Sequence, residues 1–472
     1  MTERVVIAGG GVTGLAAAYQ LQKLSRKAGV ETEIVLVEKD SFLGGKTQTE
    51  VVDGLVIEHG PDSYIGYKPW FNQVCKELGL PTVGTNPKIR STYILHKGHM
   101  EQLPVGMNIM IPTEIWPFLK TRLLTPWGKL RAGLEPFIPL KKSEEDESIG
   151  SFVGRRFGRE VLDHVAGPLM GGIHGGDWEN VSIKATFPMF PKMEREQGSL
   201  LLAGQRSKAN KPKGPTGSAF LTVPTGLKSA VDAMVKACDG VQFKLGTTVS
   251  RLTPMAGGRY LVELSTGEQL EAGAVILATP AYVAADLVQP HLPDVAAELN
   301  EIPYGNSVVV AVAYNRDEVK HPLNASGFLV PHTEPMEVTA ATWVSSKWPH
   351  SVPEGKVLFR CFLGRGYGKD WTKESDEAIL TTVKDGLKKT MGLTAEPVLH
   401  RIFRWPRAMA QYRVGHLERI DRVDALMAKA PGLYLAGAAY RGVGLPDCVR
   451  EGNQAAEKTA KHLGWVASQA AD

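Results

Sequence analysis

The stretch VVIAGGGVTGLAAAYQLQKL, residues 5–24, decides the first part of the fold. Its apolar start predicts a short buried strand, and its alanine- and leucine-rich second half predicts a helix. Glycines at positions 9, 11 and 14 form the pattern GxGxxG at the turn between them. The first permits a tight turn, the second lets the backbone approach a phosphate, and the third lets the helix pack on the strand. We therefore expect a phosphate-binding turn formed by Gly9, Gly10, Gly11, Val12, Thr13 and Gly14.

The following residues complete a unit of strand, helix and strand. RVVIA begins at Arg4, TGLAAAYQLQKLSRKAG begins at Thr13, and EIVLVE ends at Glu38. Two strands joined by a helix in this way form a right-handed parallel pair by default. Glu38 then stands at the carboxyl end of the second strand, where it can accept hydrogen bonds from a ribose diol. This context favours a dinucleotide site that includes Glu38 and Lys39 over a glycine-rich turn in an unrelated α/β domain.

The composition excludes several other classes of protein. The chain has 472 residues, of which 43% are hydrophobic and 22% charged, as in ordinary soluble globular proteins. A net charge of +4 is too small at this length to indicate nucleic-acid binding. Four separated cysteines and twelve histidines show no CxxC or HExxH spacing, which argues against disulfides and metal sites. The glycine motif begins close to Met1, and no apolar run reaches about 18 residues, so we expect no signal peptide, no membrane-spanning helix and a cytoplasmic location.

The helix and strand signals divide the chain into segments. We expect an α/β fold in which residues 1–66, 220–290 and 428–472 assemble a Rossmann-like domain interrupted by α+β insertions. Residues 67–204 carry apolar positions at helical spacing and predict a mainly helical insertion. A loop rich in lysine, proline and glycine at 205–219 is expected to be mobile. Residues 291–427 are rich in strand signals and predict a mixed-sheet substrate-binding domain.

Two motifs near Glu38 resemble the flavin amine oxidase superfamily. KDSFLGGKTQT holds a second glycine pair followed by Lys46, where the family usually has arginine. In the family this loop covers the pyrophosphate, and a lysine keeps the charge but not the planar fork of arginine. IEHGPDSYIGYK is similar to the family's flavin-side loop. The resemblance implies FAD rather than NAD, bound also by Gly45, Lys46, Gly60, Pro61, Asp62 and Ser63.

Three further stretches resemble the porphyrinogen oxidase branch of that superfamily. PLMGGIHGGD at 168–177 is similar to a branch signature, and RWPRAMAQYRVGH at 404–416 resembles a segment that brings a tryptophan against the flavin. YLAGAAYRGVGLPDCVREG at 434–452 resembles the terminal flavin motif, in which a helix N-terminus stabilises the anionic reduced flavin. Ala439 stands where the branch often has serine. The resemblance implies further FAD contacts at Val249, Trp405, Gly437, Val443, Gly444 and Leu445.

Within this branch the chain looks most similar to the coproporphyrinogen III oxidases of Gram-positive haem synthesis. The resemblance implies removal of six electrons from coproporphyrinogen III through FAD, with dioxygen as acceptor and hydrogen peroxide as product. Protoporphyrinogen IX oxidase is the first alternative. A flavin amine oxidase would usually carry GE in the terminal motif, where this chain has AGAAY. A carotenoid desaturase and a non-catalytic porphyrin-binding flavoprotein are the remaining alternatives.

The four propionates of coproporphyrinogen favour a basic rim around the substrate. Lysine at 68 could bind a propionate or be an ordinary solvated lysine, and histidine at 174 could donate to the macrocycle or be a half-buried histidine bonded to backbone. Because the flavin takes the hydride, we expect no catalytic side chain and no metal. The expected substrate contacts are Lys68, Ile173, His174 and Met409. A solvated face explains Arg195, Arg206 and Lys211 better than a role at the entrance does, and core packing explains Phe362 better than a pocket wall.

The segment PVGMNIMIPTEIWPFLKTRLLTPWGKLRAGLEPFIPL, residues 104–140, has two interpretations. Membrane-bound relatives dock on lipid through this region, and the interleaved lysines and arginines fit either a membrane face or an ordinary amphipathic surface. We expect at most a peripheral contact, together with a transient contact to the next enzyme of the haem pathway. The candidate lipid-facing residues are Trp116, Phe118, Leu123, Leu124 and Trp127.

Overall fold

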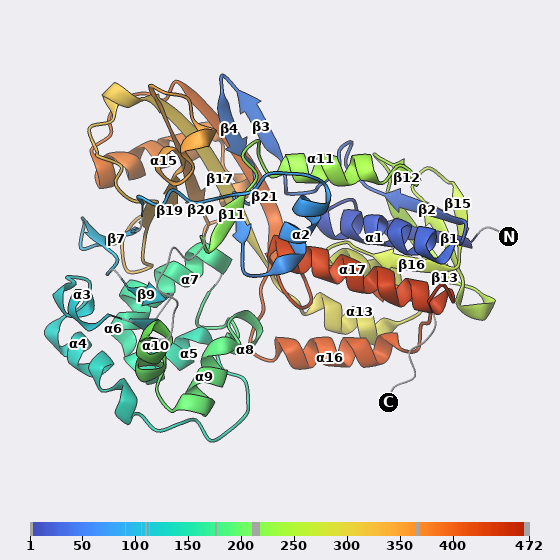
Figure 1. The fold of residues 1–472 in the computed structure, drawn as a ribbon, viewed down its shortest axis with the longest axis horizontal. Helices are drawn as coiled ribbons and strands as arrows, with labels where there is room; N and C mark the ends of the chain where they lie inside the picture. The colour runs from blue at the N-terminus through green and yellow to red at the C-terminus, as the bar shows by residue number, and fades with distance from the viewer. Residues whose placement is uncertain are drawn as a thin grey trace.

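The computed structural model describes residues 3–89, 91–104, 106–108, 111–112, 114–174, 177–209, 218–364 and 368–466, without the side chains of 108, 172–174 and 207–209. Helices α1 (Val12–Ala28) and α17 (Leu445–His462) come from opposite ends of the chain and lie side by side (Figure 1). The helices between residues 115 and 209 gather away from them at the lower left of the same view.

A parallel five-stranded sheet forms the centre of the first domain, as predicted. Val5 in the central strand pairs with Ile34 on one side and Ala274 on the other. Alternate residues of that strand are buried on opposite faces: Val5 and Ile7 pack with α1 and α17, and Val6 and Ala8 pack with an antiparallel sheet and three helices. Burial on both faces explains the continuous apolar strands. The order is β12 (Val241–Lys244), β2 (Thr32–Val37), β1 (Glu3–Ala8), β16 (Ala274–Leu277) and β22 (Leu433–Leu435).

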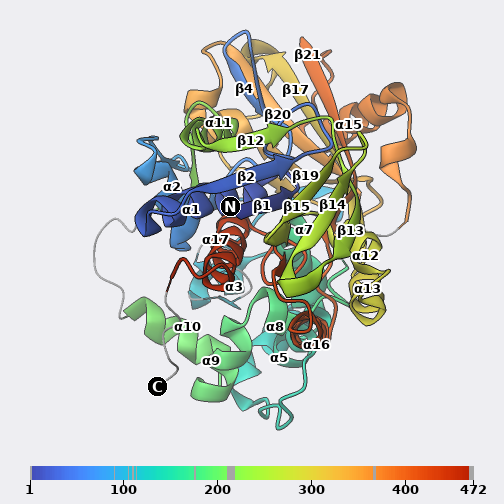
Figure 2. The same cartoon turned by 90° about the vertical axis from the view of Figure 1, so that its right-hand side faces the viewer.

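Helices and small sheets enclose this parallel sheet, and Figure 2 shows the antiparallel layer beside it. On one face lie α2 (Pro69–Glu77) and α11 (Lys228–Ala237). On the other lie β13 (Val249–Pro254), β14 (Tyr260–Leu264), β15 (Gln269–Ala272), α12 (Ala281–Val288), α13 (Pro293–Asn300) and α16 (His416–Met427). The small sheets are β3 (Thr49–Val52) with β4 (Leu55–Glu58), β9 (Met107–Asn108) with β10 (Ile111–Pro112), and β5 (Tyr64–Ile65) with β11 (Phe220–Thr222) and β6 (Val83–Gly84).

A seven-stranded mixed sheet forms the second layer, in agreement with the predicted mixed sheet. Its neighbours are antiparallel except for one parallel pair, in which Phe328 lies beside Tyr93. Two of its strands come from residues 93–102, so the segment predicted as a mainly helical insertion also supplies one edge of this sheet. Helix α15 (Asp376–Met391) covers one face. The order is β21 (Leu399–Ala410), β17 (Tyr304–Asn315), β20 (Lys356–Leu363), β19 (Val338–Trp343), β18 (Gly327–Leu329), β7 (Tyr93–His96) and β8 (His99–Gln102).

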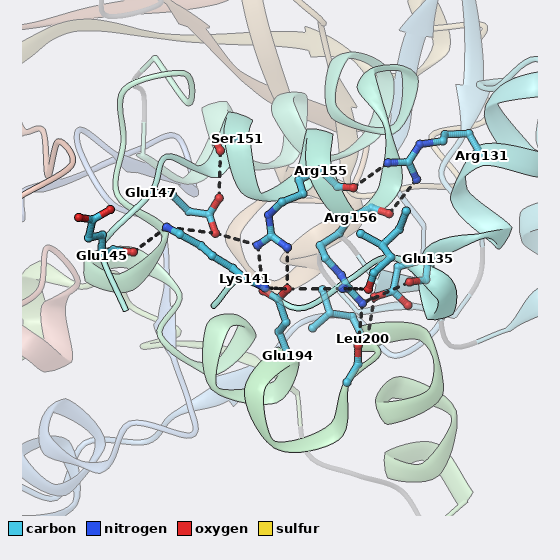
Figure 3. A network of polar contacts seen from close by, with 12 residues as sticks. Arg131, Glu135, Lys141, Glu145, Glu147, Ser151, Arg155, Arg156, Glu194 and Leu200 are labelled. Carbon is cyan, nitrogen blue, oxygen red and sulfur yellow. Dashed lines mark hydrogen bonds and ion pairs between the residues drawn. The ribbon is translucent and has the colours of Figure 1, made fainter. Parts of the chain in front are cut away.

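The helical region is held together by buried polar groups as well as by apolar packing. Ser148 caps the helix that begins at Ile149 by accepting a hydrogen bond from the backbone N–H of Ser151 at 3.0 Å. Glu135 and Arg156 form a fully buried ion pair at the centre of the network in Figure 3. The helices are α3 (Ile115–Lys120), α4 (Pro126–Gly133), α5 (Ile149–Phe157), α6 (Arg159–Val161), a π-helical turn (Leu162–Ala166), α7 (Gly167–His174), α8 (Ile183–Thr186), α9 (Met189–Gln197) and α10 (Leu200–Ala209). Helix α14 (Val344–Lys347) lies apart, between β19 and β20.

Two expectations for this region need correction. Residues 205–209 belong to α10 rather than to the predicted loop, and residues 210–217, including Lys211, lie outside the described part of the chain. Of the five candidate lipid-facing residues, only Trp116 and Trp127 are exposed, because Phe118, Leu123 and Leu124 pack into the apolar core of the helical region. Within the described ranges, no helix combines the length and apolar composition needed to span a membrane.

Candidate cofactor site

The predicted cofactor residues follow the carboxyl ends of the parallel strands. Gly9 follows β1, Glu38 follows β2, and Gly437 comes two residues after β22. Thr279, two residues after β16, lies beside Gly9 and carries a buried hydroxyl that has no partner among the described residues. Ligands of open α/β sheets bind at this edge. We did not expect Thr279, although the sequence Ala-Thr-Pro directly after an apolar strand is a usable signal.

The glycine-rich turn has the geometry that its sequence predicts. A Cβ at Gly14 would lie 1.9 Å from the carbonyl oxygen of Gly9, which excludes a side chain where the helix packs on the strand. Gly9 has φ +108°, and a Cβ there would lie 2.7 Å from the carbonyl oxygen of Ala278. A Cβ at Gly11 would meet no heavy atom within 4 Å, so the backbone of Gly11 borders open space. This space fits a phosphate that approaches the backbone.

The N-terminus of α1 presents positive charge to the same space. Gly11 precedes the helix, no side chain caps its first turn, and that turn has no acidic residue. The free N–H groups of Val12 and Thr13 therefore remain available for an anion. The backbone N–H of Gly44 donates to Gly10 at 2.8 Å, which brings the second glycine pair beside the first. Lys46 reaches solvent-accessible space, yet the surrounding protein desolvates its ammonium group and lowers the pKa of Lys46.

Glu38 is buried and oriented by backbone donors. The N–H of Gly10 donates to one carboxylate oxygen at 2.6 Å, and the N–H of Asp40 donates to the other at 2.9 Å. Each oxygen keeps a further lone pair for a ribose hydroxyl. Lys39 directs its ammonium group to Asp40 and solvent, so only its backbone is placed near the site. Val249 begins β13 and is half-buried.

The flavin-side loop, residues 59–63, lies between the pyrophosphate loop and the seven-stranded sheet. A Cβ at Gly60 would lie 2.3 Å from the carbonyl oxygen of Lys46, so the two loops touch. On the other side the indole N–H of Trp405 donates to the carbonyl of His59 at 2.9 Å. The structure therefore brings Trp405 to this loop. The carboxylate of Asp62 is bonded to Lys347 and Ser63 rather than pointing into open space.

The terminal motif leads into the N-terminus of α17 beside α1. Gly437 and Gly442 have φ of +139° and +150°, and Gly444 precedes the helix, which begins at Leu445 without a side-chain cap. Tyr412 braces this turn, because its hydroxyl donates to the carbonyl of Ala438 and accepts from the N–H of Gly442, both at 2.8 Å. Cys448, in the first turns of α17, contacts Thr13 at the start of α1. The two helix N-termini thus face one site.

The candidate substrate-binding residues are not brought together at one place as the candidate cofactor-binding residues are. The ammonium group of Lys68 is paired with Asp447 at 2.7 Å, and Asp447 is also paired with Arg450 at 3.2 Å. The side chain of Lys68 keeps 31% of its exposure, so its role toward a propionate stays a prediction. No sequence pattern indicated Asp447 as its partner. Met409 lies on β21 and is half-buried. Ile173 and His174 end α7, and their side chains lie outside the description. Among the other candidates, Phe362 is half-buried rather than in the core, and Arg195 and Arg206 are exposed.

Together these features fit FAD. The two glycine loops, the uncapped helix and Lys46 would hold the pyrophosphate, Glu38 would hold the adenosine ribose, and the terminal motif would face the flavin ring. In the described residues, no three metal-ligating side chains come together.

Comparisons with known proteins agree with this site. Residues 12–459 match the sequence profile of the family described as flavin containing amine oxidoreductase. The coproporphyrinogen III oxidase of Bacillus subtilis (strain 168) is 35% identical over 98% of each chain. That of Staphylococcus aureus (strain NCTC 8325 / PS 47) is 32% identical over 98% of this chain and 100% of its own. Protoporphyrinogen oxidase 2 of Arabidopsis thaliana is 24% identical over 98% of this chain and 94% of its own.

Solved structures show the same fold. The crystal structure of a protein from Exiguobacterium sp. 255-15 named as a protoporphyrinogen oxidase has a TM-score of 0.87 and 32% identity, with 98% of this chain and 99% of the other covered. Putrescine oxidase, at a TM-score of 0.68 and 18% identity over 99% of this chain and 100% of its own, shares the fold. By profile, full-length similarity and site geometry, the chain belongs to the flavin-containing amine oxidoreductase family and is an FAD-dependent oxidoreductase.

Proposed function

We propose that this enzyme oxidises coproporphyrinogen III to coproporphyrin III in haem biosynthesis. The observation that carries the proposal is the grouping of its relatives. Among the curated relatives, three proteins named coproporphyrinogen III oxidase are 32–35% identical over nearly the whole chain, whereas five proteins named protoporphyrinogen oxidase are 24–26% identical. A 32% identical protein of solved structure is named protoporphyrinogen oxidase, which makes that activity the alternative to be tested. The full reaction removes six electrons and six protons. Three molecules of dioxygen take them up as three molecules of hydrogen peroxide.

The chain's own residues have a limited task in this chemistry. When bound, FAD supplies the hydride acceptor. The two glycine loops and the terminal motif would hold the cofactor, and Trp405 and Met409, both on β21 of the seven-stranded sheet, are the proposed contacts on the substrate side. The indole of Trp405 is hydrogen-bonded to the flavin-side loop and would form a rigid wall of the substrate site. No side chain is assigned as a nucleophile, in keeping with hydride transfer to the cofactor.

The choice of substrate depends on charge. Coproporphyrinogen carries four carboxylates, and protoporphyrinogen carries two. A propionate would have to compete with Asp447 for Lys68, so this one contact would contribute less than a contact with an unpaired lysine would. Exposed contacts of this kind are screened over about 8 Å at physiological ionic strength.

The test is to measure kcat/KM for both porphyrinogens at low and high salt. A preference for coproporphyrinogen that weakens as salt rises supports the proposal. A salt-insensitive preference for protoporphyrinogen would assign the chain to the other oxidase. Absorption spectra recorded with the reduced porphyrinogen in air also separate an enzyme, which forms the coloured porphyrin, from a carrier, which does not.

The enzyme works in the cytoplasm, in transient contact with the next haem-pathway enzyme, and makes peripheral contact with anionic lipid through one surface. This surface consists of residues 115–142, where Trp116, Trp127 and Phe137 are 73%, 77% and 81% exposed. The only acidic residue in that range is Glu135, which is fully buried. Exposed aromatic side chains among lysines and arginines, with no exposed carboxylate, suit the headgroup region of an anionic bilayer.

A further inference from the structure

The flavin-side loop, residues 59–63, is attached to the seven-stranded sheet layer at three positions. The carbonyl of His59 accepts from Trp405 on β21, and the carbonyl of Gly60 accepts from Arg360 on β20. The carboxylate of Asp62 accepts from Lys347 at the end of α14, at 3.0 Å. The donors come from three different elements of the sheet layer, whereas the acceptors all belong to one short loop of the cofactor domain.

Arg360 stands at the centre of this attachment. Its side chain is 2% exposed, and one of its terminal nitrogens lies 3.5 Å from a carboxylate oxygen of Asp62 while another donates to Gly60. The same oxygen of Asp62 accepts from the indole N–H of Trp348 at 3.3 Å. A buried guanidinium requires partners of this kind, because an unpaired buried charge is strongly destabilising.

The attachment stays ionic over the working range of pH. Burial alone would raise the pKa of Asp62, but Lys347 and Arg360 together hold it well below its ordinary value. Asp62 is therefore charged at neutral pH. Glu58, buried behind the loop, differs: burial raises its pKa to about 7, and its carboxylate is bonded to the backbone of Leu227 and the hydroxyl of Thr49.

The loop has little freedom on its other side. Because a Cβ at Gly60 would meet the carbonyl oxygen of Lys46, the loop already touches the pyrophosphate loop. A displacement of β20 or α14 would therefore be passed on to the loop and to the cofactor beside it. Hydride transfer needs the reacting atoms within about 3–3.5 Å of each other. A fixed distance between the cofactor and the seven-stranded sheet would keep the two reacting atoms within that range.

We propose that Arg360 is a positioning residue, which clamps the flavin-side loop to the seven-stranded sheet through Gly60 and Asp62 and thereby fixes the flavin relative to that sheet. The proposal rests on FAD binding by this chain and not on the identity of its substrate. It predicts that Arg360 affects the bound flavin even when no porphyrinogen is present.

The test compares Arg360→Met, Arg360→Lys and Arg401→Met. Arg401 is a matched control, since it also links the sheet to the cofactor domain, through Glu50 at 2.8 Å, but its hydrogen bonds go to Glu50 and to the carbonyl of His400 rather than to the loop. Each protein is stripped of FAD, and the Kd for added FAD, the visible flavin spectrum and the urea midpoint of the apoprotein are measured. Arg360→Met should weaken FAD binding about 10- to 100-fold, as expected for lost hydrogen bonds to a charged group, and should alter the flavin spectrum.

Arg360→Lys should recover part of the affinity for FAD, because lysine keeps the positive charge but lacks the planar guanidinium group with its several N–H donors. Arg401→Met should leave the Kd and the spectrum unchanged. If Arg360→Met folds and binds FAD like the wild type, or if both methionine variants lower the urea midpoint alike without changing the flavin, the proposal is wrong. Should Arg360→Met fail to fold, Lys347→Met and Asp62→Asn decide the question: weaker FAD binding supports the clamp, and wild-type binding in both overturns it.

Discussion

The carboxylate of Glu38 is oriented for a ligand by hydrogen bonds from backbone N–H groups. Both of its carboxylate oxygens accept hydrogen bonds from N–H groups, those of Gly10 and Asp40, and no cation within the described residues competes for it. The same contacts tie the glycine turn to the end of β2. The position of this acid at the carboxyl end of the second strand follows from the βαβ pattern and was predictable from sequence.

Replacing Glu38 with alanine should weaken FAD binding by about 1.5–3 kcal/mol, the range for a hydrogen bond to a charged group. Titration of apoprotein with FAD measures the change, and FMN, which lacks the adenosine ribose, should bind the variant and the wild type equally. Glu33→Ala is the control, because Glu33 lies on the same strand but only forms an exposed ion pair with Arg4. Unchanged FAD affinity in Glu38→Ala would place the ribose contact elsewhere.

His416 gives the stability of the protein a defined dependence on pH. Its ring stacks on Tyr412 with centroids 3.9 Å apart, and one ring nitrogen is bonded to the carbonyl of Tyr440 at 2.8 Å. Burial, partly offset by that hydrogen bond, lowers the pKa of His416 to about 4. The unfolded chain, with a histidine pKa of about 6.5, therefore takes up the proton first as the pH falls.

The contribution of His416 should be complete above about pH 6.5 and should be lost progressively toward pH 4, by up to about 3 kcal/mol. Urea unfolding of the wild type and His416→Gln at pH 7.5, 6 and 5 measures it. The wild type should lose stability more steeply than the variant over this interval. Parallel pH profiles for the two proteins would contradict the assignment, since the other histidines contribute equally to both.

At the scale of elements, α10 begins where a distant carboxylate caps it. Glu135 accepts from the backbone N–H groups of Leu200 and Leu201, at 3.0 and 3.2 Å, from the hydroxyl of Ser199 and from Arg156 (Figure 3). The sequence around residues 205–209 is polar, so its own composition predicted a loop. The residue that caps the helix, Glu135, lies 65 positions before Leu200 in the chain. Local patterns cannot report a cap of this kind.

Glu135→Ala should lower the free energy of unfolding by about 3–5 kcal/mol, because it leaves Arg156 buried without its main partner. Chemical denaturation with intrinsic tryptophan fluorescence measures the loss. Glu145→Ala is a control within the same network, since Glu145 contributes only its carbonyl, to Lys141 at 2.7 Å, and its carboxylate is exposed. A loss of less than 1 kcal/mol in Glu135→Ala would mean that Glu194, 3.4 Å from Arg156, can replace it.

The parts of the site that the sequence predicted depend on residues close together in the chain, whereas the parts that it missed depend on contacts between residues far apart in the chain. The glycine turn, Glu38 and the start of α17 are set by neighbours in the chain, so their spacing predicts them. The pairing of Lys68 with Asp447 joins residues 379 positions apart, and that of Asp62 with Lys347 joins residues 285 positions apart. Such contacts arise only when the cofactor domain, the sheet and α17 pack together. Resemblance indicated where these residues lie, but only the fold shows what they bind.

At the scale of the whole molecule, the surface of residues 115–142 lies at the far end of the helical region from α1 and α17 (Figure 1). Contact with lipid there would leave the cofactor domain in water. The exposed residues of this surface alternate with the buried Phe118, Leu123 and Leu124, which hold it on the helical core. The sequence predicted an amphipathic segment, and the structure shows which of its apolar side chains are exposed to solvent.

The purified enzyme should therefore sediment with vesicles that contain anionic lipid and remain in solution with purely zwitterionic vesicles. Raising salt should reduce the binding, because each cation near an anionic surface contributes about 1 kcal/mol within a Debye length. Trp116→Ser combined with Trp127→Ser should abolish most of it, since it removes two aromatic anchors that are 73% and 77% exposed. Val398→Ser, at a 50% exposed position next to β21, is the control and should bind like the wild type. If the double variant binds as well as the wild type, or if neither protein distinguishes the two lipids, the surface has no role at a membrane.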